Sequence, residues 1–269
     1  MRVSYFIRFY LRVIVAVMFA IFGIFALNGC KDDELVVATA ANFTPFEYVK
    51  GQEFKGIDMD LARVIAQKLD KKLVIKDMEF DSVVTSLAGG NADIALSGLT
   101  INDTREKVID FSNTYFNASQ MLITLSDDTR FDNITTKKDL VSALKAIPNL
   151  RIGVQVGTTG LFYAKGDADW GFEGFSNATT KSFSNGALAA IAMKNAQIDV
   201  VIIDEMPAHE IVKANSGTKI IEIALTNEKY AIGITKDKPK LRDSINEILN
   251  ELKQDGTLEN IIKAYYTGK

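Results

Sequence analysis

The chain has one cysteine and one histidine among its 269 residues. A single cysteine excludes a disulfide within the chain, so the fold must be stabilised by its hydrophobic core. The scarcity of both residue types leaves no Cys/His spacing typical of a metal site. His209 stands in a helix-like stretch away from the motifs described below, which argues against a Ser-His-Asp arrangement. We therefore expect no metal, no cofactor and no catalytic histidine.

The chain also lacks an apolar run of the length that a membrane-spanning helix needs, about 20 residues. Its longest run covers 15 residues, from 13 to 27. Arg2, Arg8 and Arg12 precede this run, and Gly29 and Cys30 follow it. A basic start, an apolar centre and small residues before a cleavage site predict a signal peptide over residues 1–29.

The residues around the single cysteine, Leu27-Asn28-Gly29-Cys30, resemble a bacterial lipobox. The resemblance implies lipidation of Cys30, a linker over residues 30–33 and a membrane anchor on this cysteine. Asn28 departs from the small residue usual at that position. The alternative is that Cys30 ends an uncleaved anchor. In both cases the body of the protein lies outside the cytoplasmic membrane, in the periplasm or at the outer face of the cell membrane.

The sequence also lacks an excess of basic residues. Removal of residues 1–29 takes away three arginines and leaves 28 basic and 34 acidic residues, a net charge of −6. Nucleic-acid-binding proteins carry basic patches, so this balance argues against such a partner. A small neutral or zwitterionic ligand remains compatible with it.

Strand-like and helix-like segments alternate along the rest of the chain, which predicts an α/β fold. Apolar spacing predicts a helix over 57–69 and two more near the C-terminus, with Gly256 ending the first of these. Asp81 is expected to be the N-cap of a short helix that runs to Leu87. The expected strands are 35–39, 73–75, 92–97, 120–125, 150–155, 200–203 and 230–235.

Polar residues follow the expected strand at 92–97. Ser97, Gly98 and Thr100 come first, and Arg105 follows within a few residues. Ligands of open α/β sheets bind at the carboxyl ends of strands. An arginine placed there offers a planar set of donors that matches a carboxylate. The alternative is a surface turn with a solvated arginine.

The second half of the chain offers a complementary set. Thr158 and Thr159 lie where a strand turns into a helix, and helix N-termini bind anions. Asp204 closes the strand at 200–203 and suits an ammonium group. Together with Arg105, these residues match the α-carbon end of an amino acid. The alternatives are that the threonines cap their own helix and that Asp204 caps the segment after it.

Three further residues are candidates for contact with a ligand side chain. Phe43 lies in the loop after the first expected strand, Phe80 lies just before the short helix, and Gln155 ends the strand at 150–155. From the residues alone, a place in the core is favoured for the two phenylalanines over contact with a ligand. Gln155 is also compatible with an exposed strand position.

Three stretches resemble the extracellular solute-binding proteins of polar amino acid ABC importers, which are relatives of the histidine- and glutamine-binding proteins. The first joins Thr44-Pro45-Phe46-Glu47-Tyr48 to residues 56–62, and the second joins residues 97–105 to Asp110-Phe111-Ser112. The third comprises Gly157-Thr158-Thr159 and residues 199–204. The resemblance covers the mature chain nearly end to end.

The resemblance implies a type II periplasmic-binding-protein fold, in which two α/β lobes with mixed sheets are joined by a two-strand hinge and the ligand cleft lies between them. Residues 34–118 and 227–269 would form lobe 1, and residues 119–226 lobe 2. The partners implied are a free L-amino acid and an ABC transporter permease. We expect a monomer with no enzymatic activity.

The resemblance also assigns roles. Arg105 would bind the α-carboxylate, helped by Thr100 and the backbone of Thr159. Ser97, the carbonyl of Gly98 and Asp204 would hold the α-ammonium. Phe43 and Phe80 would flank the ligand side chain.

The identity of the amino acid is less determined. Ala40 stands where members that bind histidine, arginine or glutamine often carry an aspartate, which favours a neutral, polar side chain. Cation–π attraction to the two phenylalanines keeps a basic amino acid open as the alternative. Two alternatives come from other functional classes. A cyclohexadienyl dehydratase-like enzyme would need a general acid in the cleft, for which Glu47 and Asp81 are the candidates. A lipid-anchored sensor or adhesin with this fold would have no transport role.

Overall fold

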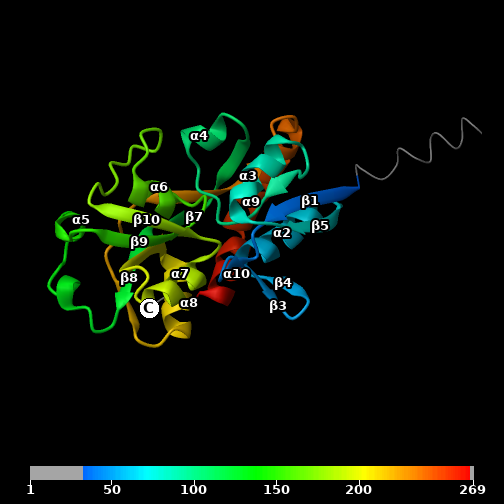
Figure 1. Cartoon of the computed structure of the whole chain (residues 1–269). Helices are drawn as coiled ribbons and strands as arrows, with labels where there is room; N and C mark the ends of the chain where they lie inside the picture. The colour runs from blue at the N-terminus through cyan, green and yellow to red at the C-terminus, as the bar shows by residue number, and fades with distance from the viewer. Residues whose placement is uncertain (1–32, 267–269) are drawn as a thin grey trace, which may run out of the picture.

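The computed structural model describes residues 33–266. The predicted signal peptide and Cys30 lie outside the described residues. Within residues 33–266, no helix has both the length and the apolar character required to cross a membrane. The chain folds into two α/β halves that lie side by side, as Figure 1 shows.

Strands and helices alternate over the whole described region. The strands are β1 (Glu34–Thr39), β2 (Asn42–Phe43), β3 (Glu47–Lys50), β4 (Glu53–Lys55), β5 (Lys72–Asp77), β6 (Ile94–Ala95), β7 (Asp110–Ala118), β8 (Gln120–Leu125), β9 (Leu150–Gln155), β10 (Ala178–Phe183), β11 (Val200–Asp204), β12 (Thr218–Ile221) and β13 (Glu228–Ile234). The helices are α2 (Ile57–Lys68), α3 (Phe80–Ala88), α4 (Asp103–Glu106), α5 (Lys137–Ala146), α6 (Thr159–Lys165), α7 (Gly186–Lys194), α8 (Glu205–Ala214), α9 (Pro239–Gln254) and α10 (Thr257–Tyr265), with a 3-10 turn at Thr129–Phe131.

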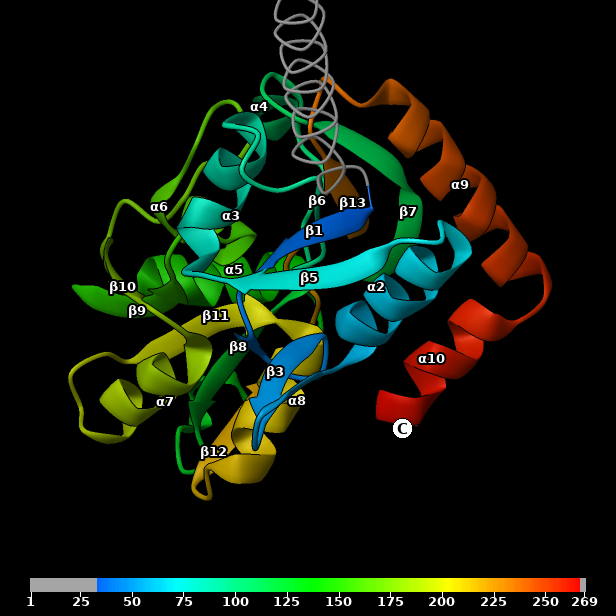
Figure 2. The same cartoon turned by 90° about the vertical axis from the view of Figure 1, so that its right-hand side faces the viewer.

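The first sheet has the order β5-β1-β6-β13-β7 and takes strands from both ends of the chain. Strand β1 is parallel to β5 and β6, whereas β13 is antiparallel to β6 and β7. Figure 2 shows α2, α9 and α10 together beside this sheet, with α3 on another side of it. The sheet and these helices are called the first lobe below.

The second sheet has the order β10-β9-β11-β8-β12 and is continuous in sequence. Strand β9 is parallel to β10 and β11, and β8 is antiparallel to β11 and β12. Helices α6, α7 and α8 pack on it. This unit is called the second lobe. Two mixed sheets with covering helices confirm the predicted α/β class.

The chain crosses between the sheets twice, and the two crossings are bonded to each other. The first passes through Ser119, between β7 and β8. In the second crossing, Leu225 donates its N–H to the carbonyl of Gln120 at 2.8 Å. The hydroxyl of Thr226 accepts the N–H of Gln120 at 2.8 Å. The lobes are therefore joined by a narrow, paired connection.

The structure corrects the prediction for Asp81. Helix α3 begins at Phe80, its N-cap is Glu79, and Asp81 lies in the first turn. The error arose because an acid suits both the cap and the first turn, where it interacts favourably with the positive end of the helix. The strand expected at 92–97 is also shorter, since only Ile94–Ala95 pairs as a strand.

Candidate functional site

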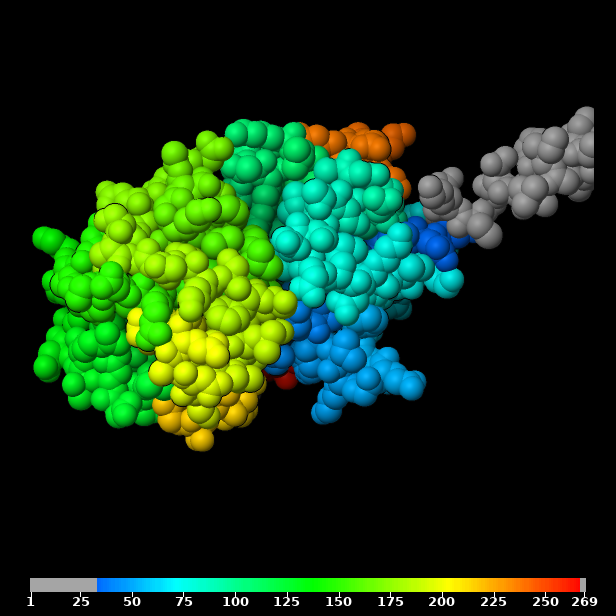
Figure 3. Space-filling view, in the orientation of Figure 1, coloured from blue at the N-terminus to red at the C-terminus, as the bar shows by residue number. Residues whose placement is uncertain are grey.

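The carboxyl ends of the parallel strands point the predicted residues toward the junction of the two lobes. Phe43 follows β1, and Ser97 and Gly98 follow β6 in the first lobe. Gln155 ends β9 and Asp204 ends β11 in the second. All ten residues predicted to contact a ligand are buried. In the space-filling view the cyan residues of the first lobe lie against the green and yellow residues of the second (Figure 3).

Arg105 comes from the first lobe and contacts the second. Its side chain is only 7% exposed, so the alternative of a solvated surface arginine is wrong. One terminal nitrogen donates to the carbonyl of Thr100 at 2.7 Å, and the other donates to the carbonyl of Gly157, in the second lobe, at 3.1 Å. Burial lowers the pKa of Arg105 to about 10, while the negative charges of Glu228 and Asp204 act in the opposite direction.

Asp204 also bonds across the junction. It is 5% exposed, and its carboxylate accepts a hydrogen bond from the hydroxyl of Tyr230, which lies on β13 of the first lobe. Burial raises the pKa of Asp204, and the nearby charge of Glu228 raises it further. Asp204 stands at the N-cap of α8 without a side-chain capping bond, which contradicts the capping alternative. A cation placed beside this carboxyl would favour its charged form.

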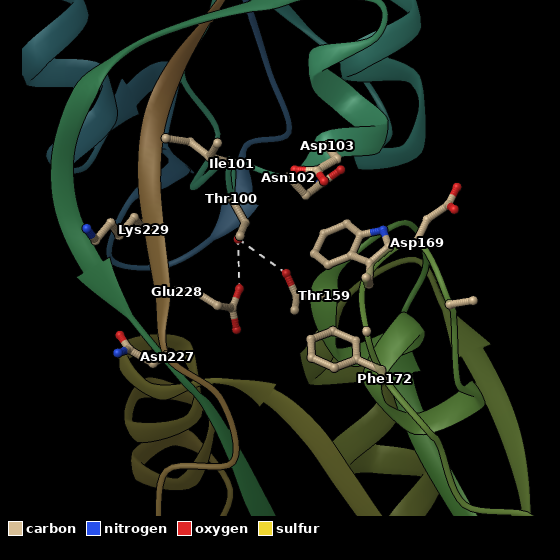
Figure 4. A pocket seen from close by; sticks show the side chains of 13 residues that line it. Thr100, Ile101, Asn102, Asp103, Thr159, Asp169, Phe172, Asn227, Glu228 and Lys229 are labelled. Carbon is tan, nitrogen blue, oxygen red and sulfur yellow. Dashed lines mark hydrogen bonds between the residues drawn. The ribbon is translucent and has the colours of Figure 1, made fainter.

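Glu228 is a buried acid that the sequence reasoning missed. Its Oε2 accepts a hydrogen bond from Thr100 at 2.8 Å, and its Oε1 accepts from Gln120 at 3.1 Å. The hydroxyl of Thr159 donates to that of Thr100 at 3.2 Å and so links the lobes, as the dashed lines in Figure 4 show. Glu228 and Tyr230 are buried, and Lys229 between them is exposed. This alternation is typical of a β-strand and is the pattern from which the burial of Glu228 could have been predicted.

Thr158 and Thr159 occupy the start of α6, as expected. Thr158 is the N-cap but makes no side-chain capping bond; its hydroxyl instead donates to the carbonyl of Gln155 at 2.8 Å. The proposal that these residues merely cap their own helix therefore does not account for their side chains. Helix α6 has seven residues, and we assign no separate anion site to its end.

Ser97 and Gly98 are tied to two buried carboxyls of the first lobe. Ser97 donates to Glu47 at 2.9 Å and accepts the N–H of Ala40 at 3.0 Å. The N–H of Gly98 donates to Asp58 at 2.8 Å. Burial raises the pKa of Asp58 to about 7 and that of Glu47 well above its ordinary range. These contacts hold the loop after β6 in place.

Phe43, Phe80 and Gln155 are buried at 5%, 7% and 1% exposure. Phe43 stacks on Phe46 with ring centroids 6.1 Å apart, and Phe80 lies 5.7 Å from the guanidinium carbon of Arg105. The side-chain oxygen and nitrogen of Gln155 are both buried and have no protein partner among the described residues. Burial contradicts the alternative of an exposed strand position, and the free amide atoms suit a polar ligand group.

A cavity of about 710 Å³ lies on one side of these contacts. It is lined by Thr100 and Glu228, by Thr159, and by a loop after α6 that carries Trp170 and Phe172. Figure 4 shows Phe172 and Thr159 facing Thr100 and Glu228 across it. Within residues 33–266 there is no group of three His, Cys, Asp or Glu side chains placed to hold a metal ion.

Two mixed-sheet lobes with opposite charges buried at their junction define a two-lobed binding-protein architecture. Comparison with known proteins agrees. The chain belongs to the bacterial extracellular solute-binding proteins, family 3, whose sequence profile matches residues 35–268. This finding confirms the family resemblance and the fold class expected from the sequence.

Similar proteins carry related names. The arginine-binding extracellular protein ArtP of Bacillus subtilis is 28% identical over 91% of this chain and 94% of its own length. The structure of an ancestral arginine-binding protein bound to glutamine has a TM-score of 0.75 and 32% identity over 88% of this chain and 99% of that one. The ancestral amino acid-binding protein AncCDT-1, a precursor of cyclohexadienyl dehydratase, has a TM-score of 0.75 and 27% identity over 88% of this chain and 96% of that one.

Proposed function

We propose that this protein binds a free L-amino acid between its two lobes and delivers it to an ABC importer. The observation that carries the proposal is the burial of Arg105 and Asp204, one from each lobe, at the same junction. The negative charge of Asp204 opposes the lowering of the Arg105 pKa that burial causes. Arg105, Thr100 and the backbone of Thr159 would bind the α-carboxylate. Asp204, Ser97 and the Gly98 carbonyl would bind the α-ammonium.

The proposed mechanism is closure of a hinge. Residues 34–118 and 227–269 form lobe 1 in this proposal, residues 119–226 form lobe 2, and the paired crossings form the hinge. A ligand that contacts both lobes favours the closed form, because only differential affinity shifts a conformational equilibrium. Burial of a zwitterion is costly unless both charges are paired, and the two residues supply one partner each.

For the ligand we favour an amino acid with a basic side chain, arginine first, and we keep glutamine, whose side chain is neutral and polar, as the second choice. The sequence alone favours a neutral polar group, because Arg105 and Asp204 balance each other. Glu228 adds a buried acid to the site, which leaves an excess of negative charge when Asp204 is ionised. A ligand with an additional positive charge compensates for this excess. The names of the relatives support the same order.

The test is calorimetry on the purified protein with the twenty amino acids. Arg105→Ala should reduce affinity for every ligand by roughly 2–5 kcal/mol, because it leaves the carboxylate without its partner. Arg105→Lys should also bind poorly, since a point charge replaces a planar set of donors. Arg242→Ala, which removes an arginine from ion pairs on the surface, is the control. Unchanged affinity in Arg105→Ala would exclude the proposed site.

An enzymatic function is the second candidate, because AncCDT-1 is described as a precursor of a dehydratase. A general acid must reach its substrate. Glu47 is fully buried and bonded to Ser97, which disfavours it in this role. Incubation with prephenate tests the alternative, and formation of an aromatic product would support it.

We further propose a lipid anchor on Cys30 after removal of residues 1–29, and a monomeric body outside the cytoplasmic membrane. The mass of the mature N-terminal peptide distinguishes a lipidated Cys30 from the uncleaved alternative. A permease and an ATPase encoded beside the gene would favour import over a sensor or adhesin.

A further inference from the structure

The only tryptophan of the chain, Trp170, lies over the guanidinium of Arg105. Its ring centroid is 5.3 Å from the guanidinium carbon. Trp170 belongs to the loop between α6 and β10 of the second lobe, whereas Arg105 belongs to α4 of the first. A cation within about 6 Å of an indole face is attracted by the ring, most strongly where water is excluded.

The indole is held in place by its own lobe. Phe162 of α6 stacks on it with centroids 4.8 Å apart and an interplanar angle of 17°. Phe172 lies 6.0 Å away, and the backbone N–H of Trp170 donates to the side chain of Asp167 at 3.2 Å. These contacts all lie within the second lobe and involve no residue of the first.

The other contacts of this loop with the first lobe are weaker. Asp169 lies 3.5 Å from both Lys107 and Thr104. The Lys107 and Asp169 side chains are each 63% exposed, and exposed ion pairs contribute little. The aromatic contact with a buried arginine is therefore the contact of this loop that we expect to affect binding.

The guanidinium has five N–H groups. Two of its hydrogen bonds go to the carbonyls of Thr100 and Gly157. The rings of Phe80 and Trp170 both lie within 5.7 Å of its central carbon. Rings at a guanidinium face exclude water there and leave the remaining N–H groups, in the plane, for a bidentate acceptor.

We propose that Trp170 is a positioning residue for ligand binding, which covers Arg105 when the lobes close and thereby strengthens the bond of Arg105 to the α-carboxylate. The inference rests on the proposed function, because it assumes an amino acid as the ligand. It adds that the second lobe contributes to binding of the ligand α-carboxylate through the aromatic ring that lies over Arg105. Trp170 acts through Arg105 and not on the ligand side chain.

Two consequences distinguish this role from a merely structural one. Loss of the ring should weaken binding of different amino acids by a similar factor, since all share the α-carboxylate. The loss should appear in the dissociation rate, because the contact between the lobes forms after the ligand has entered. The range of cation–π strengths corresponds to a loss of about twofold to thirtyfold.

The variants are Trp170→Leu, which removes the π-system, and Trp170→Phe, which keeps a ring. Calorimetry and surface plasmon resonance with arginine, glutamine and one further amino acid bound by the wild type give affinities and rates. We expect a uniform loss in Trp170→Leu and partial recovery in Trp170→Phe. In an Arg105→Ala background, Trp170→Leu should add no further loss. The unfolding midpoints of the ligand-free variants establish that both fold.

The controls separate this inference from the proposed function. If the wild type binds none of the twenty amino acids, the proposed function fails, and this inference fails with it. If the wild type binds and Trp170→Leu binds equally well, the inference alone is overturned. It is also overturned if the loss is confined to one amino acid, since that would indicate contact with the ligand side chain. Reduced acrylamide quenching of Trp170 on ligand addition would support burial of the indole on closure.

Discussion

The hydroxyl of Tyr230 donates a hydrogen bond to Asp204, so a side chain from an interior strand of the first sheet contacts the end of a strand in the second. Both residues are buried, and Tyr230 is fully enclosed by the aromatic cluster that includes Phe46 and Tyr115. The carboxyl proposed to bind the ligand ammonium is thus held by the opposite lobe through a neutral donor.

Removal of this donor should destabilise the ligand-free protein more than the ligand-bound one. Tyr230→Phe keeps the ring but takes a partner from a buried carboxyl, at a cost of about 1–3 kcal/mol. A bound ammonium supplies the carboxylate with another partner and reduces the loss. Urea unfolding with and without saturating ligand measures both. Tyr265→Phe is the control. It removes a hydroxyl that donates to Asp60 of α2 at 2.6 Å. Equal losses in both states would contradict the prediction.

A methyl group at Gly157 should hinder closure. Gly157 has φ of +75°, and a Cβ there would lie 3.1 Å from both Cα and Cβ of Asp81 in the first lobe. Gly157→Ala should therefore lose affinity as well as stability.

Gly51→Ala is the matched control for this variant. Gly51 has φ of +68° with nothing within 4 Å of the added carbon, so it shares the backbone penalty of roughly 1 kcal/mol without the obstruction. Thermal unfolding and calorimetry distinguish the two effects. An affinity loss of the same size in both variants would exclude steric hindrance at the junction.

Ligand affinity should increase with pH between about 5 and 8. The pKa of Asp204 is raised in the ligand-free protein, mainly by burial. A bound ammonium favours the carboxylate, so binding lowers this pKa and releases a proton. The affinity then falls as the pH decreases through the raised pKa, by at most about tenfold per pH unit. Calorimetry in two buffers of different ionisation enthalpy measures the released proton.

Arginine and glutamine suit this experiment because their own groups do not titrate in that range. His209→Ala is the control, since it removes the only histidine of the chain. A pH-independent affinity would show that Asp204 is already ionised before the ligand binds.

Neutralisation of Glu228 should change ligand preference. Glu228→Gln retains the shape of the side chain, and the hydroxyl of Thr100 can accept a bond from the new amide. The ratio of arginine affinity to glutamine affinity should fall by roughly threefold to tenfold, on the order of 1 kcal/mol for a charge near the protein interior. Competition binding with the two amino acids measures this ratio. An unchanged ratio would remove Glu228 from the basis of the preference for a basic ligand.

The sequence predicted the α/β class and supplied the candidate site residues because both depend on local patterns. The hydrophobic period of residues 57–69 and the polar residues after residues 92–97 are visible without a structure. Arg105 and Asp204 were selected for their charge at strand ends, and strand ends lie at the junction here.

Contacts between distant segments were not predictable in this way. Glu228 lies 128 positions from Thr100, its hydrogen-bond partner, and no local pattern joins them. Trp170 lies in a loop without periodicity, so its approach to Arg105 depends on how the lobes meet. The N-cap of α3 was misplaced because short-range preferences do not separate Glu79 from Asp81.

The position of β13 between β6 and β7 has a consequence for biosynthesis. Strand β7 has β13 as its neighbour in the sheet, and β13 is made more than a hundred residues later. All strands of the continuous second sheet are therefore synthesised before the first sheet can be completed. A chain released before residue 228 would keep the whole inserted sheet and lack the strand that carries Glu228 and Tyr230.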